Sequence, residues 1–178
     1  MKKINKKEWM KALECLDTHL DRPMKLLIVG GGALLLAHDL PLATSDIDAV
    51  PFQSDWTLSQ LDQKVKEVAE KLHLSPDWLN PYFMSFSYVL PKDYDERLIP
   101  IFKGKNMNAF ALGVEDLLIL KCFAGRERDI GHARFLIKKC KNLTLIEKHL
   151  ESLLDQRVPK AQEALDFFDE IKELIGKK

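Results

Sequence analysis

Three consecutive glycines, Gly30, Gly31 and Gly32, restrict the fold of this sequence more than any other feature. They follow the short apolar run Lys25–Val29 and precede Ala33–Ala37, whose alanines and leucines favour a helix. A short apolar run bounded by glycine is typical of a buried strand. The segment therefore predicts a strand that passes through a tight turn into a helix.

Hydrophobic periodicity extends this unit into an α+β pattern. Apolar residues spaced by three and four predict helices from Trp9 to Leu20 and from Leu58 to Leu72. Strands are expected at Ile47–Val50, Phe83–Leu90, Leu98–Phe102 and Met107–Leu112. Later helices are expected at Glu115–Ala124, Glu127–Cys140, Thr144–Leu154 (capped by Asn142 or Thr144) and Lys160–Ile175. Pro100 predicts that Leu98–Phe102 lies at a sheet edge.

Length and composition predict a single globular domain. The 178 residues suit one domain, with an α/β core over 1–112 and a helical part over 113–178 packed on it. Hydrophobic residues make up 46% and charged residues 30%, which excludes a disordered chain. The 27 basic and 27 acidic residues give zero net charge and argue against broad binding to nucleic acid.

The sequence predicts a cytoplasmic protein with no membrane partner. The longest apolar run, Lys25–Ala37, is shorter than the roughly 20 residues of a membrane span. The lysine-rich first residues of the sequence are followed by Glu8 and an amphipathic pattern, not by the apolar core of a signal peptide. Cys15, Cys122 and Cys140 are far apart among helix-period apolar residues, which favours reduced, buried thiols over disulfides or a metal site.

Two aspartates, Asp46 and Asp48, follow the glycines by about 15 residues and flank Ile47. In a strand, residues i and i+2 point to one face, so both carboxylates would lie together while Ile47 enters the core. Such like charges are tolerated when a cation lies between them, and hard oxygen ligands suit Mg²⁺. The glycine turn would leave room for a phosphate beside that cation. Either half alone equally fits a structural turn or two solvated acids.

The sequence does not match other common phosphate-binding or zinc-binding motifs. Gly30 and Gly32 are followed by Leu35 rather than by a third glycine, and no G-K-[ST] closes a phosphate loop. The five histidines lack zinc spacing. Dinucleotide, P-loop and zinc-hydrolase functions are therefore not supported.

The stretch G-G-x-A followed by A-T-x-D-I-D resembles the signature of the nucleotidyltransferase superfamily, especially its small bacterial AbiEii-like and uncharacterised nucleotidyltransferase-like branches. Leu90–Pro100 and Val114–Ile137, which contains Lys121 followed by A-G-R-E-R-D, resemble later motifs of one such uncharacterised family. The resemblance covers roughly Lys25 to Lys138. It implies a mixed sheet flanked by helices, and transfer of a nucleoside monophosphate to an acceptor hydroxyl.

The resemblance also implies site residues and ligands. Asp46, Asp48 and Lys121 would be catalytic, and the two aspartates would hold Mg²⁺ or Mn²⁺. The nucleoside triphosphate would contact Gly30, Gly31, Gly32, Thr44, Ser45, Lys121 and Asp129. The acceptor stays open between an RNA such as tRNA, a protein and a small molecule.

The residues around Lys121 support an anion partner independently. Lys121 is the only charge between Asp116 and Arg126 in a largely apolar helix. It either extends its ammonium to the surface or meets an anion, for which a triphosphate would qualify. Asp129 equally fits a first-turn acid paired with Arg126 or Arg128.

Two departures from the superfamily pattern favour a rival hypothesis. The expected strands Phe83–Leu90 and Leu98–Phe102 contain no third carboxylate, and loop acids Asp93, Asp95 and Glu96 equally fit a solvated turn. Leu42 stands where related sequences often carry arginine. The rival is a catalytically degenerate binding or regulatory module, such as one partner of a toxin–antitoxin pair. A second rival is a structural partner acting through its terminal amphipathic helices.

Overall fold

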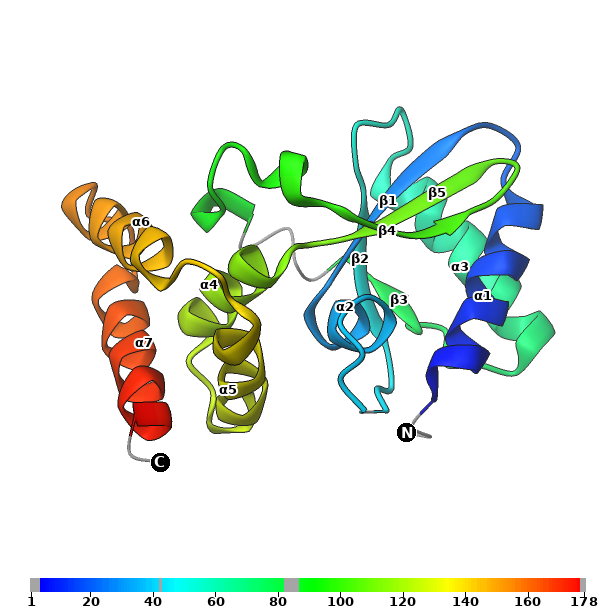
Figure 1. Cartoon of the computed structure of the whole chain (residues 1–178). Helices are drawn as coiled ribbons and strands as arrows, with labels where there is room; N and C mark the ends of the chain where they lie inside the picture. The colour runs from blue at the N-terminus through cyan, green and yellow to red at the C-terminus, as the bar shows by residue number, and fades with distance from the viewer. Residues whose placement is uncertain (1–3, 42, 82–86, 177–178) are drawn as a thin grey trace. The chain divides into compact units, whose positions relative to one another are not determined.

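The computed structural model describes residues 4–41, 43–81 and 87–176 and divides into two compact units. The sheet unit comprises Met1–Ser85 with Arg97–Leu112, and the helical unit comprises Phe86–Glu96 with Gly113–Lys178. All strands belong to the sheet unit together with the first three helices, and the last four helices belong to the helical unit (Figure 1). This combination confirms the predicted α+β class.

A five-stranded mixed sheet has the order β3-β2-β1-β5-β4. Its strands are β1 (Met24–Val29), β2 (Ile47–Pro51), β3 (Leu79–Asn80), β4 (Ile99–Lys103) and β5 (Met107–Ala111). Central β1 pairs antiparallel with β2 and parallel with β5, which fits its nearly continuous burial. β4, which contains Pro100, lies at an edge as predicted.

Three helices accompany this sheet: α1 (Lys6–His19), α2 (Gly30–Leu36) and α3 (Leu58–Leu72). α1 begins with a capping box in which Asn5 and Glu8 satisfy each other's backbone N–H groups. α1 and α3 contact each other, and Trp9 stacks on buried Trp78 with 5.8 Å between ring centroids. Their apolar faces therefore form part of the chain's own core.

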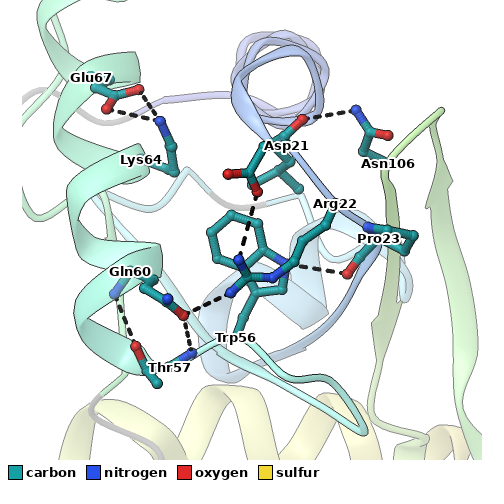
Figure 2. Close-up of polar contacts among 10 residues, drawn as sticks. Asp21, Arg22, Pro23, Trp56, Thr57, Gln60, Lys64, Glu67 and Asn106 are labelled. Carbon is teal, nitrogen blue, oxygen red and sulfur yellow. Dashed lines mark hydrogen bonds and ion pairs between the residues drawn. The ribbon is translucent and has the colours of Figure 1, made fainter.

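The start of α3 is fixed by Arg22, as Figure 2 shows. Its guanidinium lies 4.4 Å from the ring centroid of Trp56, and its Nη2 donates to Gln60 Oε1 at 2.9 Å. Trp56 Nε1 in turn donates to the Pro23 carbonyl at 3.1 Å. Thr57 and Gln60 form the capping box of α3, so the cap and the approach to β1 share one set of contacts.

The helical unit consists of α4 (Val114–Ala124), α5 (Ile130–Lys139), α6 (Leu143–Asp155) and α7 (Ala161–Gly176), with the short 3₁₀ helices η2 (Tyr94–Arg97) and η3 (Glu127–Asp129). α4 contacts each of the other three α-helices. Asn142 caps α6 by accepting the N–H of Leu145 at 3.1 Å, one of the two predicted caps. No helix in the described ranges has the length and apolar character needed to cross a membrane.

Two sequence-based predictions differ from this structure, and one strand was not predicted. Of the expected strand Phe83–Leu90, residues 83–86 lie outside the described ranges, and 87–90 form a 3₁₀ turn and bend instead. β3 has two residues, too few to show a strand pattern. The three cysteines are free as expected, but only Cys122 is fully buried, while Cys15 and Cys140 are half-buried.

A buried carboxylate joins α1 to the turn between β4 and β5. Asp17, 8% exposed, accepts the backbone N–H groups of Lys105, Asn106 and Met107 at 2.6 to 3.0 Å. Its carboxylate also lies where a Cβ on Gly104 would be. Gly104 therefore allows the close approach that these hydrogen bonds need.

We expect Asp17→Asn to lower the free energy of unfolding by about 3 kcal/mol, because an amide replaces an ionised acceptor of buried N–H groups. Urea denaturation would measure the loss. The control is Glu14→Gln on the exposed side of α1, expected to change stability by no more than about 0.5 kcal/mol. Equal effects of the two variants would contradict this role of Asp17.

Candidate functional site

The predicted aspartate pair lies where β2 begins beside the end of β1. In the antiparallel register, Asp48 is opposite Val29, the last residue of β1. Ile47 is fully buried, whereas Asp46 and Asp48 on either side of it are half-buried. The alternation that the sequence predicted is therefore present, with both carboxylates on the opposite face from Ile47.

Gly30 makes room for one of these carboxylates. It has a φ of +60°, and a Cβ there would come within 2.6 Å of Asp48 Oδ2. A Cβ on Gly31 would lie 3.5 Å from Thr44 Oγ1, which is ordinary contact. The glycines also form the first turn of α2 rather than a loop before it. The conformational freedom of glycine is thus used at Gly30 to bring the backbone against Asp48.

Among the described residues, the side chains that contact Asp46 are neutral donors. Thr44 Oγ1 donates to its backbone carbonyl at 2.9 Å and lies 3.3 Å from its Oδ1. Ser45 Oγ lies 3.5 Å from the same Oδ1, and Asn80 Nδ2 lies 3.4 Å from Oδ2. These carboxylate contacts are long and weak. Asp46 is therefore oriented without a neutralising cation, and its oxygens keep the capacity to bind one.

The segment before Asp46 is supported from the beginning of the chain. The N–H of Ile4 donates to the carbonyl of Thr44 at 2.9 Å. Lys6 Nζ also reaches Asp39 Oδ1, in the connection that follows α2, at 3.0 Å. Thr44 and Ser45, both predicted site residues, thus lie directly beside Asp46 and are tied to the N-terminal residues.

Asn80 is the site residue that sequence analysis missed. It is opposite Asp48 in the parallel register between β2 and β3. Its sequence signal is faint, because β3 consists only of Leu79 and Asn80. The helical crossover from β2 through α3 could have indicated a parallel neighbour here, since such crossovers return the chain to the same sheet.

The donor set at this site fits a hard divalent cation. The two carboxylates supply oxygen ligands, the amide of Asn80 contacts Asp46, and Mg²⁺ usually takes its remaining ligands from water and substrate phosphates. Among the residues that the structure describes, no group of three His, Cys, Asp or Glu side chains is placed to hold a metal ion. Asp46 and Asp48 are accordingly the acidic part of the candidate site.

Lys121 and Asp129, both predicted nucleotide contacts, form a buried ion pair within the helical unit. Lys121 Nζ lies 2.5 Å from Asp129 Oδ1, and the two side chains are 14% and 3% exposed. Lys121 thus meets an anion of its own chain rather than reaching solvent. Asp129 pairs with Lys121, and not with Arg126 or Arg128 as its sequence position also suggested.

The surroundings of Asp129 favour the ionised form of its carboxyl group over the protonated form. Burial alone would raise the pKa of its carboxyl, but the neighbouring His132 and Lys121 side chains and the charge of Arg126 lower it to about 2. His132 Nδ1 lies 3.6 Å from Asp129 Oδ1, and among the described residues neither this buried nitrogen nor buried Asp129 Oδ2 has a hydrogen-bond partner. Asp129 is therefore a permanent anion with one unused acceptor, not a group that exchanges protons near neutral pH.

The remaining candidate acids and thiols differ from these two clusters in exposure or pKa. Asp93, Asp95 and Glu96 belong to the helical unit and are exposed. Leu42 lies outside the described residues. Burial raises the pKa of the Cys122 thiol beyond the physiological range and that of Cys140 to about 11, so neither thiol is activated.

The glycine-opened helix and the aspartate pair at the start of the adjoining antiparallel strand are the features by which the sequence resembles the nucleotidyltransferase superfamily. Comparison with family models agrees: the family described as "Nucleotidyltransferase of unknown function (DUF6036)" matches residues 7–168. The chain belongs to this family. Comparisons with curated proteins and with solved structures gave no match. Placement in the AbiEii-like branch stays a prediction.

We expect Gly30→Ala to lower the free energy of unfolding by at least about 2 kcal/mol, because alanine disfavours a positive φ and its Cβ would collide with Asp48. Thermal and urea unfolding would measure this change. The matched control is Gly131→Ala in α5, where a Cβ meets nothing within 4 Å. That variant should be neutral or more stable by up to about 1 kcal/mol. Equal stability of both variants would refute the tight contact at Gly30.

We expect Asp129→Asn to lower the free energy of unfolding by about 3 kcal/mol at pH 7, because it leaves Lys121 buried without a counter-charge. Since folding lowers the pKa of Asp129, its ionisation stabilises the protein above about pH 4 and this contribution is lost as the pH falls toward 2. Urea unfolding at pH 7 and pH 3 should therefore show a smaller difference from wild type at pH 3.

Two further variants make this prediction specific. Glu127→Gln, an exposed acid in the same 3₁₀ helix, should change stability little at either pH. Replacing both partners, Lys121→Met with Asp129→Leu, should recover much of the loss because no charge remains buried. A double variant as unstable as Asp129→Asn would contradict the ion-pair explanation.

Proposed function

We propose that this protein is a nucleotidyltransferase that binds Mg²⁺ (or Mn²⁺) and a nucleoside triphosphate at Asp46 and Asp48. The observation that carries the proposal is the shared face of these two carboxylates beside Gly30, in a chain that belongs to a nucleotidyltransferase family. Family membership supports a nucleotide as the substrate, and the donor set supports a hard cation.

Within this proposal the sheet unit supplies the metal ligands and the phosphate contacts. Asp46 and Asp48 hold the cation, and Thr44, Ser45 and Asn80 keep Asp46 oriented. The backbone of Gly30, Gly31 and Gly32, together with Thr44 and Ser45, contacts the triphosphate. When bound, Mg²⁺ screens the phosphate charge and makes the acceptor hydroxyl easier to deprotonate.

Lys121 and Asp129 are proposed to provide a positive charge for the phosphates. An ammonium has three N–H donors, and among the described residues Lys121 donates a hydrogen bond to Asp129 alone, which leaves donors for a phosphate oxygen. Lys121 keeps in this proposal the role that the family resemblance implies, which is to meet the charge that develops on the departing pyrophosphate. Asp129 fixes the position of the ammonium through their hydrogen bond.

The central test is nucleotide binding by Asp46→Asn. We expect calorimetry with a nonhydrolysable triphosphate and Mg²⁺ to show an affinity lower by about a hundredfold or more, since even outer-shell partners of a metal ligand are worth ten- to a hundredfold. The melting temperature should stay close to wild type, because Asp46 is half-buried and its carboxylate bonds are long. Asp55→Asn, an exposed acid in the connection before α3, is the matched control.

Unchanged nucleotide binding by Asp46→Asn would refute the site. A transfer assay then separates the enzyme from a degenerate binding module, which the neutral Asn80 beside the carboxylates favours. Labelled triphosphates, Mg²⁺ or Mn²⁺ and a cell lysate should yield a labelled RNA, protein or small molecule, and Asp48→Ala should abolish the label. Binding without any transfer would instead indicate a regulatory module, such as a toxin–antitoxin partner.

A further inference from the structure

Asn80 has a fixed place at the edge of the sheet, next to the candidate metal ligands. The N–H of Ile47 donates to the carbonyl of Trp78 at 2.7 Å, which sets the register of β3 against β2. In that register buried Ile47 lies opposite buried Leu79, and Asp48 lies opposite Asn80. Asn80 therefore shares the face of Asp48 rather than the core face.

The same amide also contacts the second aspartate. Asn80 Nδ2 lies 3.4 Å from Asp46 Oδ2. A carboxylate at this position would face Asp46 as a like charge, which is unfavourable without a cation between them. An amide donates a hydrogen bond instead, so the two side chains are compatible before any metal binds.

We propose, building on the proposed function, that Asn80 is a positioning residue that makes metal binding at this site depend on the nucleotide. It orients Asp46 without adding charge, so the carboxylates of the described residues at this site are Asp46 and Asp48, and Asn80 does not add a third. Affinity for a hard divalent cation rises with the number of charged ligands. The site therefore takes up the cation together with the triphosphate, whose phosphates provide the missing negative charge.

A third carboxylate at position 80 should make the stability of the protein depend on a divalent cation. Asn80→Asp would place a carboxylate beside Asp46, with no metal to screen it. The variant should melt at a lower temperature than wild type in the presence of a chelator and regain stability when a divalent cation is added. Wild type should show little stabilisation by the cation alone.

The experiment measures Mn²⁺ binding to the full chain by the electron paramagnetic resonance signal of free Mn²⁺, without nucleotide, and in parallel follows melting temperature. We expect Asn80→Asp to bind nucleotide-free Mn²⁺ at least about tenfold more tightly than wild type, because one charged ligand is added. The matched control is Asn108→Asp, which adds the same charge on β5 opposite Lys25, toward the other end of β1. It should leave Mn²⁺ affinity unchanged.

Each outcome is decisive. Unchanged Mn²⁺ affinity in Asn80→Asp, or an equal gain in Asn108→Asp, would overturn the role of Asn80. Tight nucleotide-free binding by wild type would overturn the dependence on nucleotide. If Asn80→Asp unfolds without metal, recovery of its melting transition by Mn²⁺ supports the proposal and failure to recover overturns it. The proposed function fails separately, when Asp46→Asn retains Mg²⁺-dependent nucleotide binding.

Discussion

The antiparallel pairing of β1 with β2 is the constraint on which the candidate site depends. It sets Asp48 opposite Val29 and so brings its carboxylate against Gly30, the next residue of the chain. A shift by one residue would turn Ile47 outward and both aspartates into the core. The burial of Ile47 therefore does more than fill the core, because it selects the register in which the carboxylates stay accessible.

The two charged clusters illustrate opposite ways of keeping an ion in a folded protein. Asp129 is almost fully buried and is compensated internally by Lys121, so that its charge persists to low pH. Asp46 is half-buried and contacts only hydroxyl and amide groups, which orient it without cancelling its charge. The internally paired Asp129 suits a structural role. Asp46, whose charge is not compensated by these contacts, suits a ligand for an added cation.

The sequence was most informative where local signals are strong. The bounds of α3 follow from its apolar spacing and the core of β2 from its short apolar run, and the alternation at Asp46, Ile47 and Asp48 follows from strand geometry. Contacts between distant segments were not predictable, because neither Asn80 on a two-residue strand nor Asp17 beneath the β4–β5 turn has a local pattern. The 3₁₀ turn at 87–90 was mistaken for part of a strand since apolar runs of that length fit several structures.

The hydrogen bond from Ile4 to Thr44 makes the candidate site depend on residues outside the sheet. Ile4 lies before α1, whereas Thr44 lies beside Asp46 and donates a hydrogen bond to its backbone carbonyl. The geometry at the start of β2 therefore depends on a contact between two distant parts of the sequence. A substitution at Ile4 that weakens this contact acts on the candidate site itself, although Ile4 is far from the aspartates in sequence.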